Sequence, residues 1–365
     1  FGDVPIKSTY LIDESDFVAV HKSNYVELYD VLKGIKEGGT FLLNSPWSVA
    51  EMEEIIPGDL RRTIAEKNIN FYNIDAVKIA GEVGLGGRIN MIMQTCFFNL
   101  ANVLPVEKAI ELLKADIKAK FGKKGDKIVN MNIEAVDKTL DNLVKVDVPA
   151  SWASAETAAK EFEPATPFVE NVMRKINATK GDELPVSAFA VDGVFEQGTA
   201  QYEKRGVGIN VPEWIADNCI QCMQCSYVCP HAAIVPCILT DDEMAGAPES
   251  FVALEGKGKG MSDYKVRLQV NVLDCQGCGN CADICPAKTT ALEMKPAATQ
   301  LDAEADNFKF SKTIPYKTDI LKRESLKGSQ LWQPLLEFSG ACAGCGETPY
   351  VKLITQLYGE RMTIA

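Results

Sequence analysis

Residues 219–230 read CIQCMQCSYVCP, and residues 275–286 read CQGCGNCADICP. Each run separates three cysteines by two residues each, adds a fourth cysteine after three more residues, and ends in proline. The two runs are therefore one motif that occurs twice in the same part of the chain. This duplication is the most specific pattern in the sequence.

The spacing is that of bacterial ferredoxins that hold two [4Fe–4S] clusters. Three closely spaced cysteines lie on a loop that curls around one cubane and supplies three thiolates. A short helix carries the fourth cysteine away, so that it ligates the other cluster. We therefore predict two crossed quartets of ligands, Cys219, Cys222, Cys225 with Cys285, and Cys275, Cys278, Cys281 with Cys229.

The residues beside these cysteines suit the same chemistry. Pro230 and Pro286 have no N–H and a fixed φ, which shapes the turn leaving each cluster. Gly277 and Gly279 let the backbone approach the sulfides, where N–H groups stabilise negative charge. The alternative is structural zinc, which prefers two separated cysteine pairs around one tetrahedral ion. Four cysteines packed into one short run, and then duplicated, fit zinc poorly.

Composition argues against several other classes of protein. Of the 365 residues, 46% are apolar and 24% are charged, which excludes wholesale disorder. The net charge of −12 disfavours a duplex nucleic-acid binder, because such proteins present a basic face. Mean hydropathy is −0.05 and no long apolar run occurs, so we expect no membrane span.

The twelve cysteines are unevenly distributed, since Cys96 is the only one that precedes Cys219. Clustered cysteines in a long chain without a secretory signal indicate metal chemistry in a reducing compartment, and we expect the cytoplasm. Cys96, in an apolar helix, is expected to be a buried small hydrophobe, and Cys237 to be structural. The absence of an initiator Met and the uncapped end suggest a piece cut from a longer polypeptide.

Residues 1–148 are predicted to form one layered α/β domain, because β-type runs alternate with helical periodicity. Strands are expected over residues 9–12, 17–20, 40–44 and 70–74. Helices are expected over residues 26–35, 89–104, 106–120 and 133–143.

Four segments follow this domain. Residues 149–212 are expected to be a linker with the EKR segment. Its first part, to about residue 167, has little to bury, and the charge run Glu203-Lys204-Arg205 near its end is expected to form a solvated face. The ferredoxin domain is expected over residues 213–300. Residues 301–340 are predicted to be a loop-like connector, and residues 341–365 to begin a further domain.

A third cysteine pair, Cys342 and Cys345, lies at the start of that last segment. Two thiolates cannot complete a cubane, which normally takes four. A thioredoxin-like redox pair and half of a zinc site both stay open, although no matching βαβ unit precedes the pair. We favour half of a third metal site whose other ligands lie beyond Ala365.

The chain resembles the pyruvate:ferredoxin (flavodoxin) oxidoreductase family. The resemblance is carried by the duplicated cysteine motif, the Glu-Lys-Arg segment, residues 340–350 (GACAGCGETPY) and residues 84–91 (GLGGRINM). It implies an α/β multidomain fold that forms the middle of such an enzyme. A layered α/β gamma-type domain would be followed by a small linker domain with the EKR segment, a bacterial-type 2[4Fe–4S] ferredoxin domain, and the truncated start of the thiamine-diphosphate-binding domain.

The same resemblance implies the chemistry. The family oxidatively decarboxylates pyruvate with coenzyme A as co-substrate, uses thiamine diphosphate with Mg²⁺, and passes single electrons through three [4Fe–4S] clusters to ferredoxin or flavodoxin. It also implies a homodimer in an anaerobic or microaerophilic cell, with the rest of the same polypeptide as partner and no nucleic acid or membrane. Because most thiamine ligands lie elsewhere, we expect the isolated chain not to turn over pyruvate.

Residue roles follow from position in the resemblance. Cys342 and Cys345 would be two ligands of the third cluster, and Glu347 would lie against thiamine diphosphate. Asn90 and Asn132 match polar contacts to coenzyme A. The lysines at 114, 118, 120, 123, 124 and 127 could face its phosphates, but a solvated helix face is the favoured interpretation. No catalytic residue is assigned within the chain.

Two rival functions stay open. The first is another 2-oxoacid:ferredoxin oxidoreductase, because the residues that select the substrate lie outside this chain. The second is a non-catalytic iron–sulfur module for electron transfer with an α/β docking domain.

Overall fold

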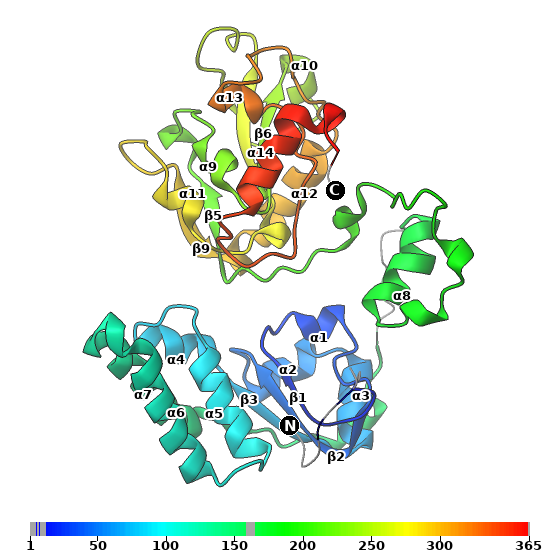
Figure 1. Ribbon diagram of the computed structural model, residues 1–365, viewed down its shortest axis with the longest axis vertical. Helices are drawn as coiled ribbons and strands as arrows, with labels where there is room; N and C mark the ends of the chain where they lie inside the picture. Colours follow the sequence, from blue (N-terminus) through cyan, green and yellow to red (C-terminus); the bar gives the residue numbers. More distant parts are fainter. Residues whose placement is uncertain (1–4, 6, 8–11, 158–164, 364–365) are drawn as a thin grey trace. The chain divides into compact units, whose positions relative to one another are not determined.

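The computed structural model describes residues 5, 7, 12–157 and 165–363. Contacts divide the chain into two compact units, Phe1–Phe162 and Glu163–Ala365, here called unit 1 and unit 2. Figure 1 traces the helices and strands of each unit, and each unit contains hydrophobic cores of its own. Among the residues that the structure describes, no helix has the length and apolar character needed to cross a membrane.

Unit 1 is built on a four-stranded sheet in the order β1-β2-β3-β4. The first three strands are parallel and β4 is antiparallel to β3, with bounds Ser15–Val20, Ile35–Asn44, Asn70–Ile74 and Val144–Lys145. The strands predicted over residues 17–20, 40–44 and 70–74 are confirmed. Of the strand predicted over residues 9–12, residues 9–11 lie outside the described part of the chain.

The helix predicted over residues 26–35 is wrong beyond its first turn. Helix α1 covers only Tyr25–Leu28, and Ile35 already opens β2. Between them, Gly34 has a φ of +76°, and its backbone packs so closely on the carbonyl group of Asp13 that no side chain would fit. The helical spacing therefore gives way to a tight turn, because the buried strand β2 has to begin at Ile35.

The other helices of unit 1 pack on this sheet or on one another. They are α2 (Val49–Ile55), α3 (Gly58–Glu66), α4 (Ala76–Glu82), α5 (Asn90–Leu100), α6 (Val106–Phe121) and α7 (Asp126–Thr139). Helices α5, α6 and α7 share a core that includes Met91, Ile117 and Val136. The predicted helices 89–104 and 106–120 correspond to α5 and α6, whereas the helix predicted over 133–143 begins earlier, at Asp126.

The segment after β4 is anchored to unit 1 by a tryptophan. Trp152 lies in the 3-10 turn Ala150–Ser154, is fully buried, and packs near Phe71, with a distance of 6.3 Å between ring centroids. Phe71 in turn stacks on Phe41 at 5.0 Å. The expectation that this linker has little to bury is therefore wrong at its start, since one aromatic side chain outweighs the small polar residues around it.

Unit 2 begins with a series of short turns. They are a π-helical turn Val169–Met173, helix α8 (Arg174–Asn177) and 3-10 turns Gly181–Glu183, Val186–Ala188 and Thr199–Tyr202. The rings of Phe168, Phe189 and Phe195 pack together in this segment.

The rest of unit 2 contains a repeated structure that follows the repeated cysteine motif. Each half consists of a strand, a 3-10 turn, a cysteine loop, a short helix and a second strand. The first half uses β5 (Asn210–Trp214), α9 (Gln224–Val228) and β6 (Ile234–Leu239), and the second uses β8 (Lys265–Val270), α11 (Asn280–Asp283) and β9 (Leu292–Pro296). β5 pairs with β9, and β6 with β8, both antiparallel, so the halves interlock. The short strand β7 (Leu254–Glu255) extends the second sheet.

The segment predicted as a loop-like connector, residues 301–340, is partly helical. Helix α12 covers Leu301–Ser311 and α13 covers Leu326–Ser329, while α10 (Asp241–Met244) and α14 (Thr348–Tyr358) complete unit 2. Helix α12 has little apolar periodicity because it is held by both apolar and polar contacts. Phe310 packs edge-on against Phe251 at 4.8 Å, whereas the buried Asn307 bonds to Ser250. Local hydrophobic periodicity therefore missed a helix that is held by specific contacts.

Candidate metal centres

The fourth cysteine of each run lies with the first three cysteines of the other run. One small cavity is lined by Cys219, Cys222, Cys225 and Cys285, with Met223, Leu268 and Leu292 among its apolar walls. A second cavity is lined by Cys275, Cys278, Cys281 and Cys229, with His231, Ile234 and Met294 beside them. The structure thus brings together the two quartets that the crossed assignment requires, which we call quartet A (with Cys285) and quartet B (with Cys229).

Backbone N–H groups point at the sulfur atoms of both quartets. In quartet A, Gln221 donates to Cys219 Sγ at 3.4 Å and Ala291 to Cys285 Sγ at 3.4 Å. In quartet B, Gly277 donates to Cys275 Sγ at 3.4 Å and Ala233 to Cys229 Sγ at 3.3 Å. Such donors stabilise the negative charge of an iron–sulfur centre, so the residues present fit that group.

Both cysteine loops use left-handed backbone at the same two places. In the second loop these places are Gly277 and Gly279, with φ of +68° and +82°. In the first loop they are Gln221 and Met223, with φ of +58° and +65°. The glycines could be recognised from the sequence, but Gln221 and Met223 could not, because neither residue type indicates a left-handed backbone.

The amide of Gln221 supports this conformation. Its Nε2 donates to the carbonyl oxygen of Glu255 at 2.7 Å, and its Oε1 accepts from the backbone N–H of Lys257 at 2.8 Å. Gln221 is almost fully buried, so both bonds are shielded from water. The side chain thereby ties the first cysteine loop to β7.

Burial raises the proton affinity of three of the cysteine thiols. It raises the pKa of Cys225 and of Cys275 to about 12 and raises the pKa of Cys281 further, with neighbouring cysteines adding to the rise for Cys281. Such thiols carry protons at neutral pH. Binding of a metal centre therefore has to displace those protons, which couples assembly to pH.

A buried lysine on α14 reaches the first cysteine helix. Lys352 is 2% exposed, and its Nζ donates to the carbonyl oxygen of Ser226 at the centre of α9. Burial lowers the pKa of Lys352 to about 8, while Cys229 and Cys225 act in the opposite direction. A cation at this position opposes the negative charge of the thiolates, and the sequence carried no signal for it.

The Glu-Lys-Arg run is not the solvated face that was expected. Glu203 is exposed, but Lys204 is turned inward and pairs with Asp274, with 2.6 Å between Nζ and Oδ2. The side chain of Asp274 is only 3% exposed and directly precedes Cys275. The interpretation from charge alone failed because the counter-ion is distant in sequence.

The third cysteine pair lies beside quartet B. Cys342 is exposed and Cys345 half-buried, and the backbone of Gly344 between them packs near the Cβ of Cys278. His231, from the wall of quartet B, has its Nδ1 3.1 Å from the carbonyl oxygen of Ser339. Hydrogen bonds from backbone N–H groups at the start of α14 lower the pKa of Cys345, which favours a thiolate there.

The other predicted site residues lie on three different helices, α5, α7 and the start of α14. Glu347 is exposed at the start of α14, and Asn90 is exposed at the start of α5. Asn132 is buried in α7, and its Nδ2 donates to the carbonyl oxygen of Ile128 at 2.8 Å. Among the described residues no hydrogen bond joins Asn90 to Asn132.

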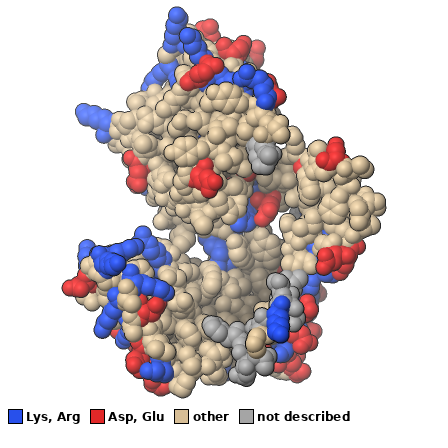
Figure 2. Space-filling model, in the orientation of Figure 1, with Lys and Arg blue, Asp and Glu red and all other residues tan. Residues whose placement is uncertain are grey.

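The lysine-rich helices of unit 1 carry ion pairs. Lys114 pairs with Asp137, and Lys120 pairs with Asp116 at 2.7 Å. Figure 2 shows Lys and Arg gathered, with acidic residues among them, at the end of unit 1 that carries the turn between α6 and α7. This arrangement agrees with the solvated helix face favoured above.

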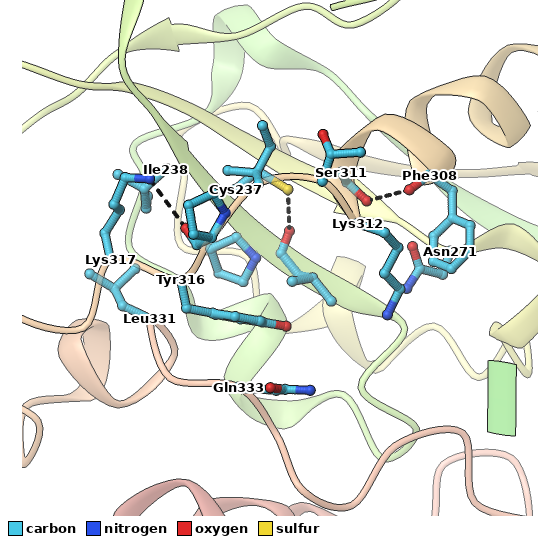
Figure 3. Close-up of a pocket in the computed structure, with 15 residues that line it drawn as sticks. Cys237, Ile238, Asn271, Phe308, Ser311, Lys312, Tyr316, Lys317, Leu331 and Gln333 are labelled. Atoms are coloured by element: carbon cyan, nitrogen blue, oxygen red, sulfur yellow. Dashed lines mark hydrogen bonds between the residues drawn. The ribbon is translucent and has the colours of Figure 1, made fainter. Parts of the chain in front are cut away.

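The two remaining cysteines lie apart from the quartets. Cys96 is fully buried in α5, which confirms the expectation of a small core residue, and burial raises its pKa to about 12. Cys237 lies on β6 at a cavity of about 440 Å³, shown in Figure 3. Its thiol faces the carbonyl oxygen of Val235 at 3.9 Å, and Tyr316 and Lys312 line the same cavity.

Comparisons with known families match three successive segments. Residues 1–141 match the family described as pyruvate ferredoxin/flavodoxin oxidoreductase. Residues 154–208 match the EKR family, a domain of unknown function, and residues 212–286 match a 4Fe-4S dicluster domain. The predicted α/β fold class with a following ferredoxin domain is thereby confirmed.

Individual relatives match along the whole chain. Pyruvate:ferredoxin oxidoreductase of Moorella thermoacetica is 56% identical over 366 residues, and pyruvate-flavodoxin oxidoreductase of Enterobacter agglomerans is 48% identical over 367. Each alignment covers 100% of this chain and 31% of the relative. Pyruvate dehydrogenase [NADP(+)] of Euglena gracilis is 49% identical over 370 residues, of which this chain covers 20%.

The chain spans about a third of the length of the first two relatives. The three matched segments follow one another along the chain, and the alignment with the Moorella enzyme covers the whole chain. Over its whole length the chain is similar to part of enzymes named pyruvate:ferredoxin and pyruvate-flavodoxin oxidoreductase, and residues 1–141 match the model of that family.

Proposed function

We propose that this chain is the electron-relay portion of a pyruvate:ferredoxin (flavodoxin) oxidoreductase. The complete enzyme would convert pyruvate and coenzyme A into acetyl-coenzyme A and carbon dioxide, and would deliver electrons to ferredoxin or flavodoxin. The observation that carries the proposal is the pair of crossed cysteine quartets in unit 2. Similarity to enzymes with this name over the whole chain supports the choice of pyruvate.

The chain's own residues would hold and insulate the redox centres. Bound [4Fe–4S] clusters supply one-electron transfer, which acid–base side chains cannot provide. Quartets A and B would each hold one cluster, and the backbone donors would stabilise its charge. Cys342 and Cys345 would give two ligands to a third cluster, and the short distance between Gly344 and Cys278 favours electron transfer between that site and quartet B.

The remaining assignments concern groups that bind largely outside this chain. Glu347 would contact thiamine diphosphate with its Mg²⁺, and Asn90 and Asn132 would contribute to the binding of coenzyme A. The exposure of Glu347 and Asn90 leaves both side chains accessible to such ligands. The full polypeptide would act as a homodimer in the cytoplasm.

Activity assays on the complete polypeptide and on this chain test the proposal. Anaerobically purified full-length protein is expected to reduce ferredoxin or flavodoxin only when pyruvate and coenzyme A are both present. The isolated 365-residue chain is expected to contain iron and sulfide yet to show no pyruvate-dependent dye reduction. Turnover by the isolated chain would contradict the assignment of the thiamine site to other segments.

The same preparation separates the rival functions. Higher kcat/KM for 2-oxoglutarate or a branched 2-oxoacid than for pyruvate would identify another oxidoreductase of this type. Failure of the full-length protein to bind thiamine diphosphate would favour a non-catalytic electron carrier. Colourless protein that contains zinc would exclude both.

A further inference from the structure

The EKR segment packs directly on the loop that carries the first three cysteines of quartet B. We define the strap as residues 203–209. The backbone N–H of Gly206 donates to the carbonyl oxygen of Leu273 at 2.9 Å, and Ala297 donates to the carbonyl oxygen of Ile209 at 2.8 Å. A side chain at Gly208 would collide with the carbonyl oxygen of Cys275, at 2.8 Å from its Cβ. The strap therefore lies against the backbone of the cysteine loop itself.

One ion pair fixes the strap to this loop. Lys204 Nζ lies 2.6 Å from Asp274 Oδ2, and the two side chains are 20% and 3% exposed. The ammonium group also lies over the rings of Phe308, at 4.9 Å, and Phe338, at 4.1 Å. Two charges are thus enclosed by apolar rings next to Cys275, where Coulomb interactions are weakly screened.

Two further charged side chains face this pair. Lys312 lies 5.3 Å from the Phe308 ring and 5.6 Å from the Phe338 ring, and Glu337 interacts electrostatically with Lys204 and Asp274. The Lys204–Asp274 pair is therefore one part of a local charge cluster. A variant of either partner changes the net charge of this cluster beside quartet B.

The first cysteine loop lacks this arrangement. The position that precedes its first cysteine is occupied by Asn218, a neutral residue whose Nδ2 donates to the carbonyl oxygen of Thr290 at 2.9 Å. The repeated motif therefore carries a carboxylate before Cys275 and an amide before Cys219. The difference allows one redox centre to be tuned without the other.

We propose that Lys204 of the EKR segment is a positioning residue for quartet B, which orders the cysteine loop through Asp274 and makes the reduction potential of its cluster differ from that of quartet A. The proposal rests on the cluster assignment given above. Net charge and solvent exposure are known determinants of cluster potential, and this pair controls both at one site. It gives the domain of unknown function a physical role that requires no ligand of its own.

Redox titration of the full-length protein, followed by electron paramagnetic resonance, tests this role. Lys204→Met removes the positive charge that is paired with Asp274, so the potential of the cluster in quartet B is expected to fall. Asp274→Asn leaves the lysine in place, so the same potential is expected to rise. The potential of the cluster in quartet A should stay unchanged in both variants. Opposite signs at the same cluster distinguish electrostatic tuning from mere loss of packing.

Three further variants complete the experiment. Lys204→Arg should restore the parent potential, and the exposed Lys175→Met should change neither cluster. Asn218→Asp places a carboxylate before Cys219 and should lower the potential of the cluster in quartet A. Release of iron to a chelator should become several-fold faster in Lys204→Met and return toward the parent rate in Lys204→Arg.

The outcomes separate this inference from the proposed function. A parent protein without iron, sulfide and two cluster signals from unit 2 would overturn the proposed function itself. A parent protein with both clusters, whose potentials stay the same in Lys204→Met and in Asp274→Asn, would overturn only the role of Lys204. Shifts of equal sign in the two variants would also contradict it.

Discussion

Cys229 and Cys285 connect the two halves of the ferredoxin domain, because each lines the cavity formed by the other half. Single cysteine variants cannot test this crossing, since either arrangement loses one cluster when one ligand is removed. Pairs of variants can test it. Substituting two ligands of the same cluster should remove no more iron than substituting one of them. Substituting one ligand of each cluster should remove twice as much iron.

Cys222→Ala combined with Cys285→Ala removes two members of quartet A, so we expect the full-length protein to lose about four iron atoms. Cys222→Ala combined with Cys229→Ala removes one member of each quartet and is expected to lose about eight. Iron and sulfide analysis measures both. Cys237→Ala, at a buried cysteine outside the quartets, is the control and should retain all iron. The reverse order of losses would show that each run holds its own cluster.

Some site residues can be predicted from a short stretch of sequence, and others depend on contacts with distant segments. The quartets could be predicted from spacing, because the motif encodes its own geometry over a dozen residues. Lys204 was misread because its partner Asp274 is far along the chain, and a charge run alone resembles a solvated face. Gln221 was missed because its left-handed backbone is stabilised by contacts with β7, which no local pattern reveals.

The secondary-structure elements show the same division. Strands β2 and β3 were found because their runs are apolar and lie between turn signals. The helix expected over residues 26–35 failed where the tertiary contact of Gly34 with Asp13 overrides the helical spacing. Helix α12 was missed because its buried face includes Asn307, which a hydrophobic pattern does not count. Contacts between distant segments therefore decide where local patterns mislead.

The second cysteine loop contains a matched pair of glycines for a test of backbone packing. Both have positive φ, but a Cβ at Gly277 would lie 2.7 Å from the carbonyl oxygen of Asn210, whereas a Cβ at Gly279 would meet no atom within 4 Å. In the protein without its clusters, Gly279→Ala is expected to cost about 1–2 kcal/mol for the left-handed backbone alone. Gly277→Ala adds a collision with β5 that costs a further ~1–3 kcal/mol.

Cluster loss during thermal unfolding measures this difference. The bleaching of visible absorption should move to lower temperature in both variants, and further in Gly277→Ala than in Gly279→Ala. Quartet B should bleach before quartet A in Gly277→Ala, because only its loop is displaced. Equal shifts in the two variants would contradict the collision with Asn210 as the cause.

The two units have separate cores, and this separation has a thermodynamic consequence. In unit 1 the stacked rings of Phe41 and Phe71 and the buried Trp152 belong to one cluster of apolar side chains. In unit 2 the apolar residues around the quartets form another, and Phe251 belongs to a smaller one. Domains with their own cores can unfold in separate transitions, so the chain is expected to melt in two steps.

Substitutions in the two cores should move the two steps independently. Trp152→Ala removes a fully buried side chain from unit 1, and large-to-small changes of this kind cost about 3–5 kcal/mol. Its transition, followed by far-ultraviolet circular dichroism, should fall in temperature while the bleaching of the clusters stays where it was. The side chain of Phe251 in unit 2 is 1% exposed. Phe251→Ala should lower the bleaching temperature of the clusters and leave the transition of unit 1 unchanged. If Trp152→Ala lowers the bleaching temperature as much as the circular-dichroism transition, the units unfold as one and their cores are coupled.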